Sequence, residues 1–369
     1  MAVPRPGSTA RSPLPWLAGI LLAYLVAPLA LFLARSAGHP SEGFSQAGLF
    51  GALATSAEAA TITTSLVALC GLPLAYLLAR HHGRLAGIAG AAVQLPLALP
   101  PLVSGVVLLY LFGPNSTLGT LANGRFTESV MGIVLAQSFV SSPFLVIGAR
   151  SAFRAVGADL EEVAATTGMG PLARYLRVAL PLAGPGVRAA LVLTWLRAFG
   201  EYGATVMMSY YPFSLPVFIY VQFSAVGLPA TQAPALLALG LATIVVILGR
   251  AHFPAHFPAR RRSRERAAVP VTAAAVSPAV AAGPPVPVGF RLSITTGSFH
   301  LELAHQAGSH RLAIVGPSGA GKSLTLRALA GLLPGDVTFA ERPVGHLPAE
   351  HRRVGYVPQG QALLPDRSA

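Results

Sequence analysis

The chain has 369 residues, 53% of them hydrophobic and only 11% charged, and its mean hydropathy is +0.61. This composition excludes an ordinary soluble globular protein, in which about 25% of residues are charged. The net charge of +13 would suggest a nucleic-acid partner in a soluble chain. Here the arginines lie between long apolar blocks, with no basic face of interleaved aromatics. We therefore expect a protein of the lipid bilayer that binds no nucleic acid.

The cysteine and histidine residues indicate neither a disulfide nor a metal site. The single cysteine, Cys70, allows no intrachain disulfide. The ten histidines lack metal-ligand spacing, and the adjacent pair His81 and His82 indicates a solvated loop rather than a metal site.

Six apolar segments are long enough to span a bilayer, which takes about 20 helical residues. They are Leu14–Ala34, Ala59–Ala79, Leu85–Phe112, Val130–Ala149, Val187–Met208 and Ala233–Leu248. The first exceeds the core of a signal peptide, which is about 7–15 residues long, so we favour a span there. The third contains three prolines and is expected to be kinked or broken. Leu215–Leu228 is apolar but short, and indicates an interfacial or re-entrant piece.

Arginines are concentrated in every second connecting loop. They precede the first span, separate spans two and three and spans four and five, and follow the sixth, whereas the other loops carry one arginine at most. The positive-inside rule therefore predicts six spans with both termini in the cytoplasm.

The loop between spans four and five, about residues 154–186, has a pattern of its own. Acidic residues at Asp159, Glu161 and Glu162 favour a helix start, Gly168 a helix end, and Pro171 the start of a second helix. The loop resembles the E-A-A-x₃-G-x₉-I-x-L-P signature of ATP-binding-cassette importer permeases. The matching positions are Glu162, Ala164, Gly168, Val178, Leu180 and Pro181, with Val163 and Val178 as conservative departures. The resemblance implies a coupling helix that docks into a cleft of an ATPase.

The predicted fifth span, which also contains Arg188, carries a candidate ion pair. Arg197 and Glu201 are four residues apart and on a helix would share a face. An ion pair inside a membrane marks either a gate in a transport pathway or an inert structural contact. The run from Phe199 to Thr205 is similar to the G-E-F-G-A-T stretch of the oxyanion branch of these permeases. That resemblance implies molybdate or tungstate as substrate, with sulfate as the alternative.

The segment 252–289 is rich in proline and alanine and contains a basic cluster at Arg260–Arg266. It is expected to be a tether that contacts anionic lipid headgroups.

A phosphate-binding loop follows. Its residues are Gly316, Pro317, Ser318, Gly319, Ala320, Gly321, Lys322 and Ser323, which fit G-x-x-x-x-G-K-[ST]. A strand is predicted at Arg311–Val315 and a helix from Lys322 to about Leu332, the context in which such a loop binds phosphate. Lys322, the only lysine of the chain, would reach the terminal phosphates of ATP and the Ser323 hydroxyl would hold Mg²⁺.

Further on, Val354 to Gln359 resembles the Q-loop of the cassette ATPases, which implies that Gln359 lies near Mg²⁺ and lines the coupling-helix cleft. Phe299 and Phe290 both remain candidates for stacking on adenine. The family's signature loop, catalytic glutamate and switch histidine have no counterpart in the sequence. We therefore expect the chain alone not to hydrolyse ATP.

The sequence thus predicts an all-α polytopic bundle of six transmembrane helices (1–251), a linker (252–289) and a truncated α/β P-loop ATPase fragment (290–369). Expected partners are a second permease copy, complete ATPase subunits, an extracytoplasmic substrate-binding protein and the bilayer of the plasma membrane. The expected function is ATP-driven import of an oxyanion. A truncated, non-transporting fusion is an alternative, while a soluble P-loop enzyme with a membrane anchor fits neither the six spans nor the coupling loop.

Overall fold

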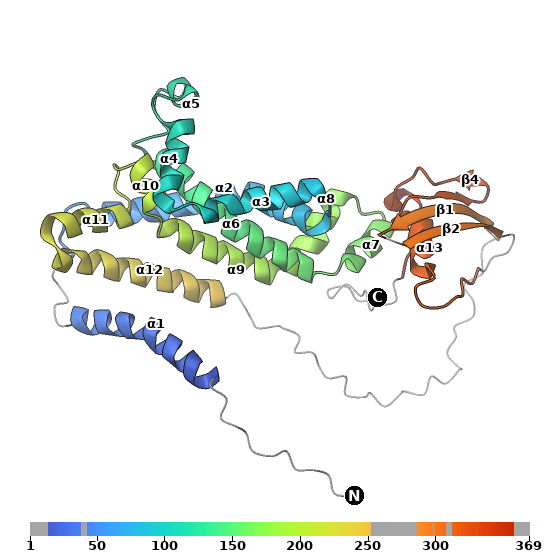
Figure 1. Cartoon of the computed structure of the whole chain (residues 1–369), viewed down its shortest axis with the longest axis horizontal. Coiled ribbons are helices and arrows are strands. Elements are labelled where there is room, and N and C mark those ends of the chain that lie inside the picture. Colours follow the sequence, from blue (N-terminus) through green and yellow to red (C-terminus); the bar gives the residue numbers. More distant parts are fainter. Residues whose placement is uncertain (1–13, 38–42, 252–285, 298, 308–311, 358–369) are drawn as a thin grey trace, which may run out of the picture. The chain divides into compact units, whose positions relative to one another are not determined.

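A computed structural model describes residues 14–37, 43–251, 286–297, 299–307 and 312–357 (Figure 1). Their contacts define two compact units. Unit 1 comprises Met1–Thr61, Pro101–Gln137 and Phe199–Ile244, and unit 2 comprises Ile62–Pro100, Ser138–Ala198 and Val245–Ala369.

Most of the described residues as far as Ala251 are helical. They are α1 (Leu14–Ala37), α2 (Leu49–Arg80), α3 (Arg84–Ala98), α4 (Pro101–Phe112), α5 (Thr117–Leu121), α6 (Val130–Ala155), α7 (Ala158–Thr166), α8 (Pro171–Arg174), the π-helical turn η1 (Tyr175–Ala179), α9 (Leu180–Phe199), α10 (Gly203–Met208), α11 (Leu215–Val226), the 3₁₀ turn η2 (Leu228–Thr231) and α12 (Gln232–Ala251). Among these residues, five helices are long and apolar enough to cross a membrane, or six spans if the bent pair α3 and α4 counts as one.

The predicted break in the third span is confirmed. Helices α3 and α4 meet at an angle of 115°. Leu99, at the break, has an extended backbone with φ −87° and ψ 135°. A residue before a proline avoids helical geometry, so Leu99, followed by Pro100 and Pro101, ends α3.

The predicted fifth span, Val187–Met208, is wrong at both ends. The apolar helical stretch runs over Pro171–Phe199. Residues Gly200–Tyr202 are not helical and separate this stretch from α10. Val178, Leu180 and Pro181, predicted in a cytoplasmic loop, therefore lie in this helical stretch. Proline cannot donate the helical hydrogen bond and crowds the preceding turn. The widened turn η1, which ends two residues before Pro181, fits that constraint.

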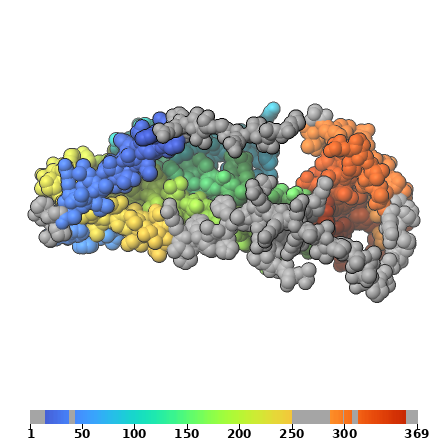
Figure 2. All heavy atoms as spheres, turned by 90° about the horizontal axis from the view of Figure 1, so that it is seen from below, coloured from blue at the N-terminus to red at the C-terminus, as the bar shows by residue number. Residues whose placement is uncertain are grey.

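Helix α1 lies apart from the packed core of unit 1. No residue of its most apolar 18-residue window is buried, although that window has a mean hydropathy of 2.4. Its blue spheres are open to view in Figure 2. A helix that is apolar on all sides is stable in lipid, so α1 fits a span that faces the bilayer.

In unit 1, helices α4 and α10 pack closely through glycines. A Cβ added to Gly203 would lie 2.7 Å from Cβ of Pro101, and one added to Gly105 would lie 2.6 Å from Cβ of Met207. Small residues let helix backbones approach in a membrane, where no hydrophobic effect drives them together.

The helical core of unit 2 joins the C-terminal end of α2 to α6 and α9. Buried there are Ala75, Leu78, Ala79, Val146, Ala149, Phe153, Val156, Ala179, Ala183 and Val187. Glycine again permits close contact, because a Cβ on Gly186 would lie 2.6 Å from Cβ of Ala152. These contacts fix the helices that carry the segment between α6 and α8.

A small sheet forms the C-terminal part of unit 2. Strands β1 (Val288–Thr296), β2 (Phe299–Ala307), β3 (Asp336–Phe339) and β4 (Arg342–Pro343) have the order β2-β1-β3-β4 and pair antiparallel. Alternate residues of β1, namely Phe290, Leu292 and Ile294, are buried in one cluster with Ala328 of α13 (Lys322–Leu329). One face of the sheet is thus covered by the helix that follows the phosphate-binding loop.

The strand predicted before that loop is not found in the described residues 312–315, and α13 ends three residues earlier than predicted. Val315 is 88% exposed. A strand needs a neighbouring strand for its backbone hydrogen bonds, and local sequence does not supply one.

Arg352 stabilises the end of α13. It is buried, and its guanidinium donates to the carbonyls of Ala328 (2.9 Å), Leu329 (3.3 Å), Gly345 (2.9 Å) and Leu347 (2.7 Å). Burial lowers the pKa of the Arg352 guanidinium from its ordinary value. A cation at a helix C-terminus satisfies carbonyls that lack an intrahelical partner.

We predict that Arg352→Met destabilises this part of the full-length protein. Leaving several buried carbonyls without donors costs about 1–3 kcal/mol. Amide hydrogen exchange in the last turn of α13 should therefore accelerate by roughly ten- to a hundredfold. Arg353→Met, at the exposed neighbouring arginine, is the matched control. Unchanged exchange in the Arg352 variant would refute the stabilising role.

Candidate coupling and nucleotide-binding sites

The short helix α7 lies between two long helices of unit 2 and is positioned by its ends. Asp159 and Glu161 occupy its first turn, where carboxylates favour the helix dipole. Gly168 follows with φ +92°, a left-handed backbone that glycine adopts without strain. Pro171 then opens α8. The predicted start, stop and second helix are all found, although the segment outside the long helices is shorter than predicted.

Consecutive glutamates of α7 face different partners. Glu161 is 7% exposed and accepts hydrogen bonds from Tyr76 and Arg80 of α2. Glu162 accepts from Nη2 of Arg327 in α13 and forms an ion pair with it. Neighbouring helical residues point about 100° apart, so one short helix can contact both a membrane helix and the C-terminal segment.

Further contacts join α7 to the C-terminal segment. The amide of Tyr356 donates to Oγ1 of Thr166 at 3.4 Å. The short helix η4 (Ala349–His351) also packs against α7. Ala164 and Ala165 are buried, and their small side chains allow close approach. Of the predicted coupling residues, Glu162 contacts the C-terminal segment directly, whereas Val178, Leu180 and Pro181 belong to the helical stretch described above.

The phosphate-binding loop leads into α13 through glycines with left-handed backbones. Gly319 has φ +85° and Gly321 has φ +88°. Nζ of Lys322 donates to the carbonyls of Gly316 (2.8 Å) and Pro317 (2.6 Å), so the side chain folds over the loop. Ser323 is exposed at the start of α13. Backbone amides at a helix N-terminus and a nearby cation suit a phosphate group. The residues of the loop therefore fit a nucleotide.

The two candidate adenine-stacking residues have different environments. Phe290 is 6% exposed and packs in the core between the sheet and α13. Phe299 is 37% exposed, and its Cε1 would lie 3.5 Å from a Cβ added to Gly321 of the phosphate-binding loop. An exposed ring beside the loop can stack on a base, whereas a core ring cannot. Gln359 lies outside the described residues.

Glu201 lies beyond the end of α9, in the break before α10. It is 1% exposed, and its Oε1 accepts a hydrogen bond of 2.9 Å from the amide of Ala204. The carboxylate thus satisfies a free amide in the first turn of α10. Helix α9 ends at Phe199, so Glu201 does not share that helix with Arg197. A gate at these residues stays a prediction.

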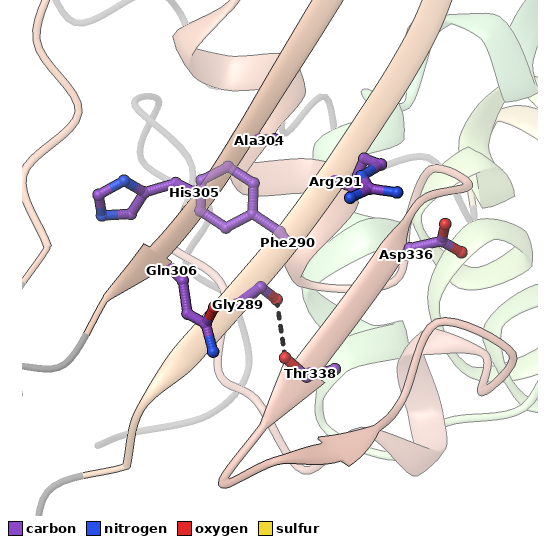
Figure 3. Close-up of a pocket in the computed structure, with 8 residues that line it drawn as sticks. All are labelled: Gly289, Phe290, Arg291, Ala304, His305, Gln306, Asp336 and Thr338. Atoms are coloured by element: carbon purple, nitrogen blue, oxygen red, sulfur yellow. Dashed lines mark hydrogen bonds between the residues drawn. The ribbon is translucent and has the colours of Figure 1, made fainter.

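An open pocket of about 520 Å³ lies on the sheet (Figure 3). Gly289, Arg291, Gln306 and Thr338 are among its lining residues. Gly289 pairs with Gln306 at one end of the β1–β2 hairpin, whereas Phe299, next to the phosphate-binding loop, lies at the other end. The pocket is therefore separate from the nucleotide-binding loop. No cluster of three or more metal-ligating side chains occurs within the described ranges.

Comparisons with known proteins extend over both parts of the chain. Residues 71–257 match the family described as binding-protein-dependent transport system inner membrane component, and residues 300–369 match the ABC transporter family. The chain is 42% identical over 233 residues to the probable molybdenum ABC transporter permease protein of Haloferax volcanii, covering 63% of this chain and 86% of that protein.

Two further relatives carry similar descriptions. The molybdenum transport system permease protein ModB of Mycobacterium tuberculosis is 42% identical over 202 residues, which cover 53% of this chain and 74% of ModB. The molybdate/tungstate transport system permease protein WtpB of Thermococcus kodakarensis is 33% identical over 233 residues, which cover 62% of this chain and 90% of WtpB.

Proposed function

Because the chain belongs to the family of inner-membrane components of binding-protein-dependent transport systems, we propose that it forms the membrane path for uptake of molybdate or tungstate. It is a multi-pass membrane protein with a segment of the ABC transporter family. The observation that carries the choice of substrate is the 42% identity to a molybdenum permease across 86% of that relative.

The contacts of α7 support a coupling role within this function. In unit 2, Glu162 bonds to Arg327 in the helix that the phosphate-binding loop opens, so α7 touches the segment that would respond to a nucleotide. Thr166 and η4 extend the same contact. ATP, when bound, would supply free energy for closing the ATPase. The role of α7 is to pass that movement to the membrane helices.

Within the nucleotide site we assign roles to individual residues. Lys322 would hold the terminal phosphates, Ser323 would present its hydroxyl to Mg²⁺, and the exposed ring of Phe299 would stack on the base. The open glycine-rich loop and the proximity of Phe299 to Gly321 support this assignment.

The working assembly that we propose contains two copies of the permease, ATPase subunits and a substrate-binding protein on the outer side. The arginine-rich loops support a cytoplasmic position of both termini. Exposed apolar side chains along α4, among them Leu102, Val106 and Tyr110, provide a surface for a second copy or for lipid.

Uptake of radiolabelled molybdate by cells that produce the full chain, together with ATPase subunits and a binding protein, tests the function. We expect uptake that excess tungstate abolishes and that an equal excess of sulfate leaves unchanged. Inhibition by sulfate at the same concentration would replace the proposed substrate class by sulfate. If the chain reaches the membrane and no uptake occurs, it is a non-transporting fusion.

A further inference from the structure

The cytoplasmic end of α2 meets the start of α7 at a buried polar contact within unit 2. The hydroxyl of Tyr76 donates to Oε2 of Glu161 at 2.6 Å. Arg80 donates to Oε1 of the same carboxylate through Nε at 2.9 Å and through Nη2 at 2.5 Å. Nη2 also donates to the carbonyl of Val156, just before α7, at 3.1 Å. Both carboxylate oxygens of Glu161 therefore bond to α2.

Aromatic packing holds the donors of this contact in place. The ring of Tyr76 lies 5.5 Å from that of Phe153 in α6 and 5.0 Å from that of Tyr175 at the start of η1. The guanidinium carbon of Arg80 lies 5.8 Å from the centre of the Tyr76 ring, within the range of a cation–π contact. Rings of this size restrict side-chain rotation, so the two donors point at Glu161 without further ordering.

Burial makes the contact sensitive to the loss of either partner. The side chains of Arg80 and Glu161 are 17% and 9% exposed. A charged group removed from water is stabilised when its partner is well placed, and is strongly destabilising when the partner is lost. Arg80 holds one carboxylate oxygen of Glu161 and Tyr76 holds the other, so the contact also fixes the direction of α7.

Glu161 therefore has a role distinct from that of Glu162. We propose that Glu161 is a positioning residue which, through Tyr76 and Arg80, fixes α7 to α2, so that a displacement of α7 moves the cytoplasmic end of α2. The inference rests on the proposed coupling role of α7, and it identifies α2 as the first membrane helix to receive the displacement.

Two observations favour transmission to α2. Val156 and Glu161 flank the turn into α7, so Arg80 holds the turn and the helix together as one body. Arg150 of α6 donates to the carbonyl of Leu78 at 3.1 Å, which ties the same end of α2 to the helix that leads into α7. The end of α2 cannot shift without α7 unless these bonds break.

A distance measurement tests the fixation without relying on transport. Spin labels at His82→Cys and Thr167→Cys, both exposed, are introduced into the full chain with Cys70 replaced by serine. In lipid nanodiscs we expect one narrow distance distribution. Glu161→Gln should broaden this distribution, because the ion pair between Arg80 and residue 161 is lost. Asp159→Asn removes the same charge from the same helical turn at an exposed site, and should leave the distribution unchanged.

Rescue and uptake separate positioning from general stability. The reversed pair Arg80→Glu with Glu161→Arg should narrow the distribution again. In cells, Glu161→Gln should lower the maximum rate of molybdate uptake about ten- to a hundredfold, the loss expected for one charged hydrogen bond. The molybdate concentration at half-maximal uptake and the amount of protein in the membrane should not change.

Other results would overturn the inference. These are an unchanged distance distribution in Glu161→Gln, equal broadening in Asp159→Asn, or a shift in half-saturation with an unchanged maximum rate. Should Glu161→Gln fail to reach the membrane, Tyr76→Phe, which removes one hydrogen bond and keeps the ring, carries the same expectation of broadening. Absence of uptake by the unmodified chain would contradict the proposed function alone. The distance measurement would still test whether α7 is fixed to α2.

Discussion

Glu162→Arg is expected to lower molybdate uptake about tenfold while leaving the amount of protein in the membrane unchanged. Glu162 forms an ion pair with Arg327, and the two side chains are 14% and 35% exposed. The substitution places two arginines against each other. Like charges at about 4 Å repel by roughly 4 kcal/mol at an effective dielectric constant of 20. Solvent at Arg327 reduces this to about 1–2 kcal/mol, or roughly a tenfold loss of association between α7 and α13.

A reversed pair is the decisive control for this prediction. Arg327→Glu combined with Glu162→Arg restores opposite charges at the same two positions, and uptake should recover in the double variant. Asp159→Arg changes the charge of an exposed residue in the same helix and should have little effect. Failure of the double variant to recover, with normal membrane insertion, would mean that α7 acts on a different ATPase surface.

Lys322→Ala should weaken nucleotide binding by the full chain about ten- to a hundredfold, since a charged hydrogen bond contributes about 1.5–3 kcal/mol. In the structure, Nζ of Lys322 already lies over the loop, bonded to the carbonyls of Gly316 and Pro317. A phosphate group would replace these neutral acceptors by charged ones, which bind an ammonium group more strongly. Fluorescence of a labelled ATP analogue, titrated against the protein in nanodiscs with Mg²⁺, measures the affinity.

Two further variants distinguish a general effect of positive charge from stacking on the adenine base in that titration. Arg342→Ala removes one exposed positive charge from the same segment, so its affinity should equal that of the unmodified chain. Phe299→Ala should weaken binding of the labelled ATP analogue, because the exposed ring beside Gly321 would be lost. Equal affinity of Lys322→Ala and the unmodified chain would refute nucleotide binding at this loop.

Local sequence rules were sufficient for α7 and for the broken third span. Asp159, Glu161, Gly168 and Pro171 each act within one turn of the backbone, so the bounds of α7 and the start of α8 follow from them. Pro100 and Pro101 likewise end α3 whatever packs around them. Hydropathy located the apolar blocks because the requirement for about 20 apolar residues is set by the bilayer.

Sequence rules failed where the outcome depends on neighbours distant in the chain. Pro181 was expected in a loop of about residues 154–186, but it lies inside one continuous helical stretch that follows a π-helical turn. Residues 312–315 have the composition of a strand but no partner strand in the described structure. Phe299 and Phe290 could not be told apart, because only the packing of α13 on the sheet makes Phe290 a core residue.

The sequence by itself determined the class of this protein: a membrane permease whose family signature, apolar spans and phosphate-binding loop each depend on residues close in the chain. Only the tertiary structure decided what the two glutamates of α7 do. Their partners, Arg80 and Arg327, are 81 and 165 residues away, and adjacent side chains diverge around a helix. Glu161 therefore holds α7 to α2, while Glu162 faces the nucleotide-binding segment.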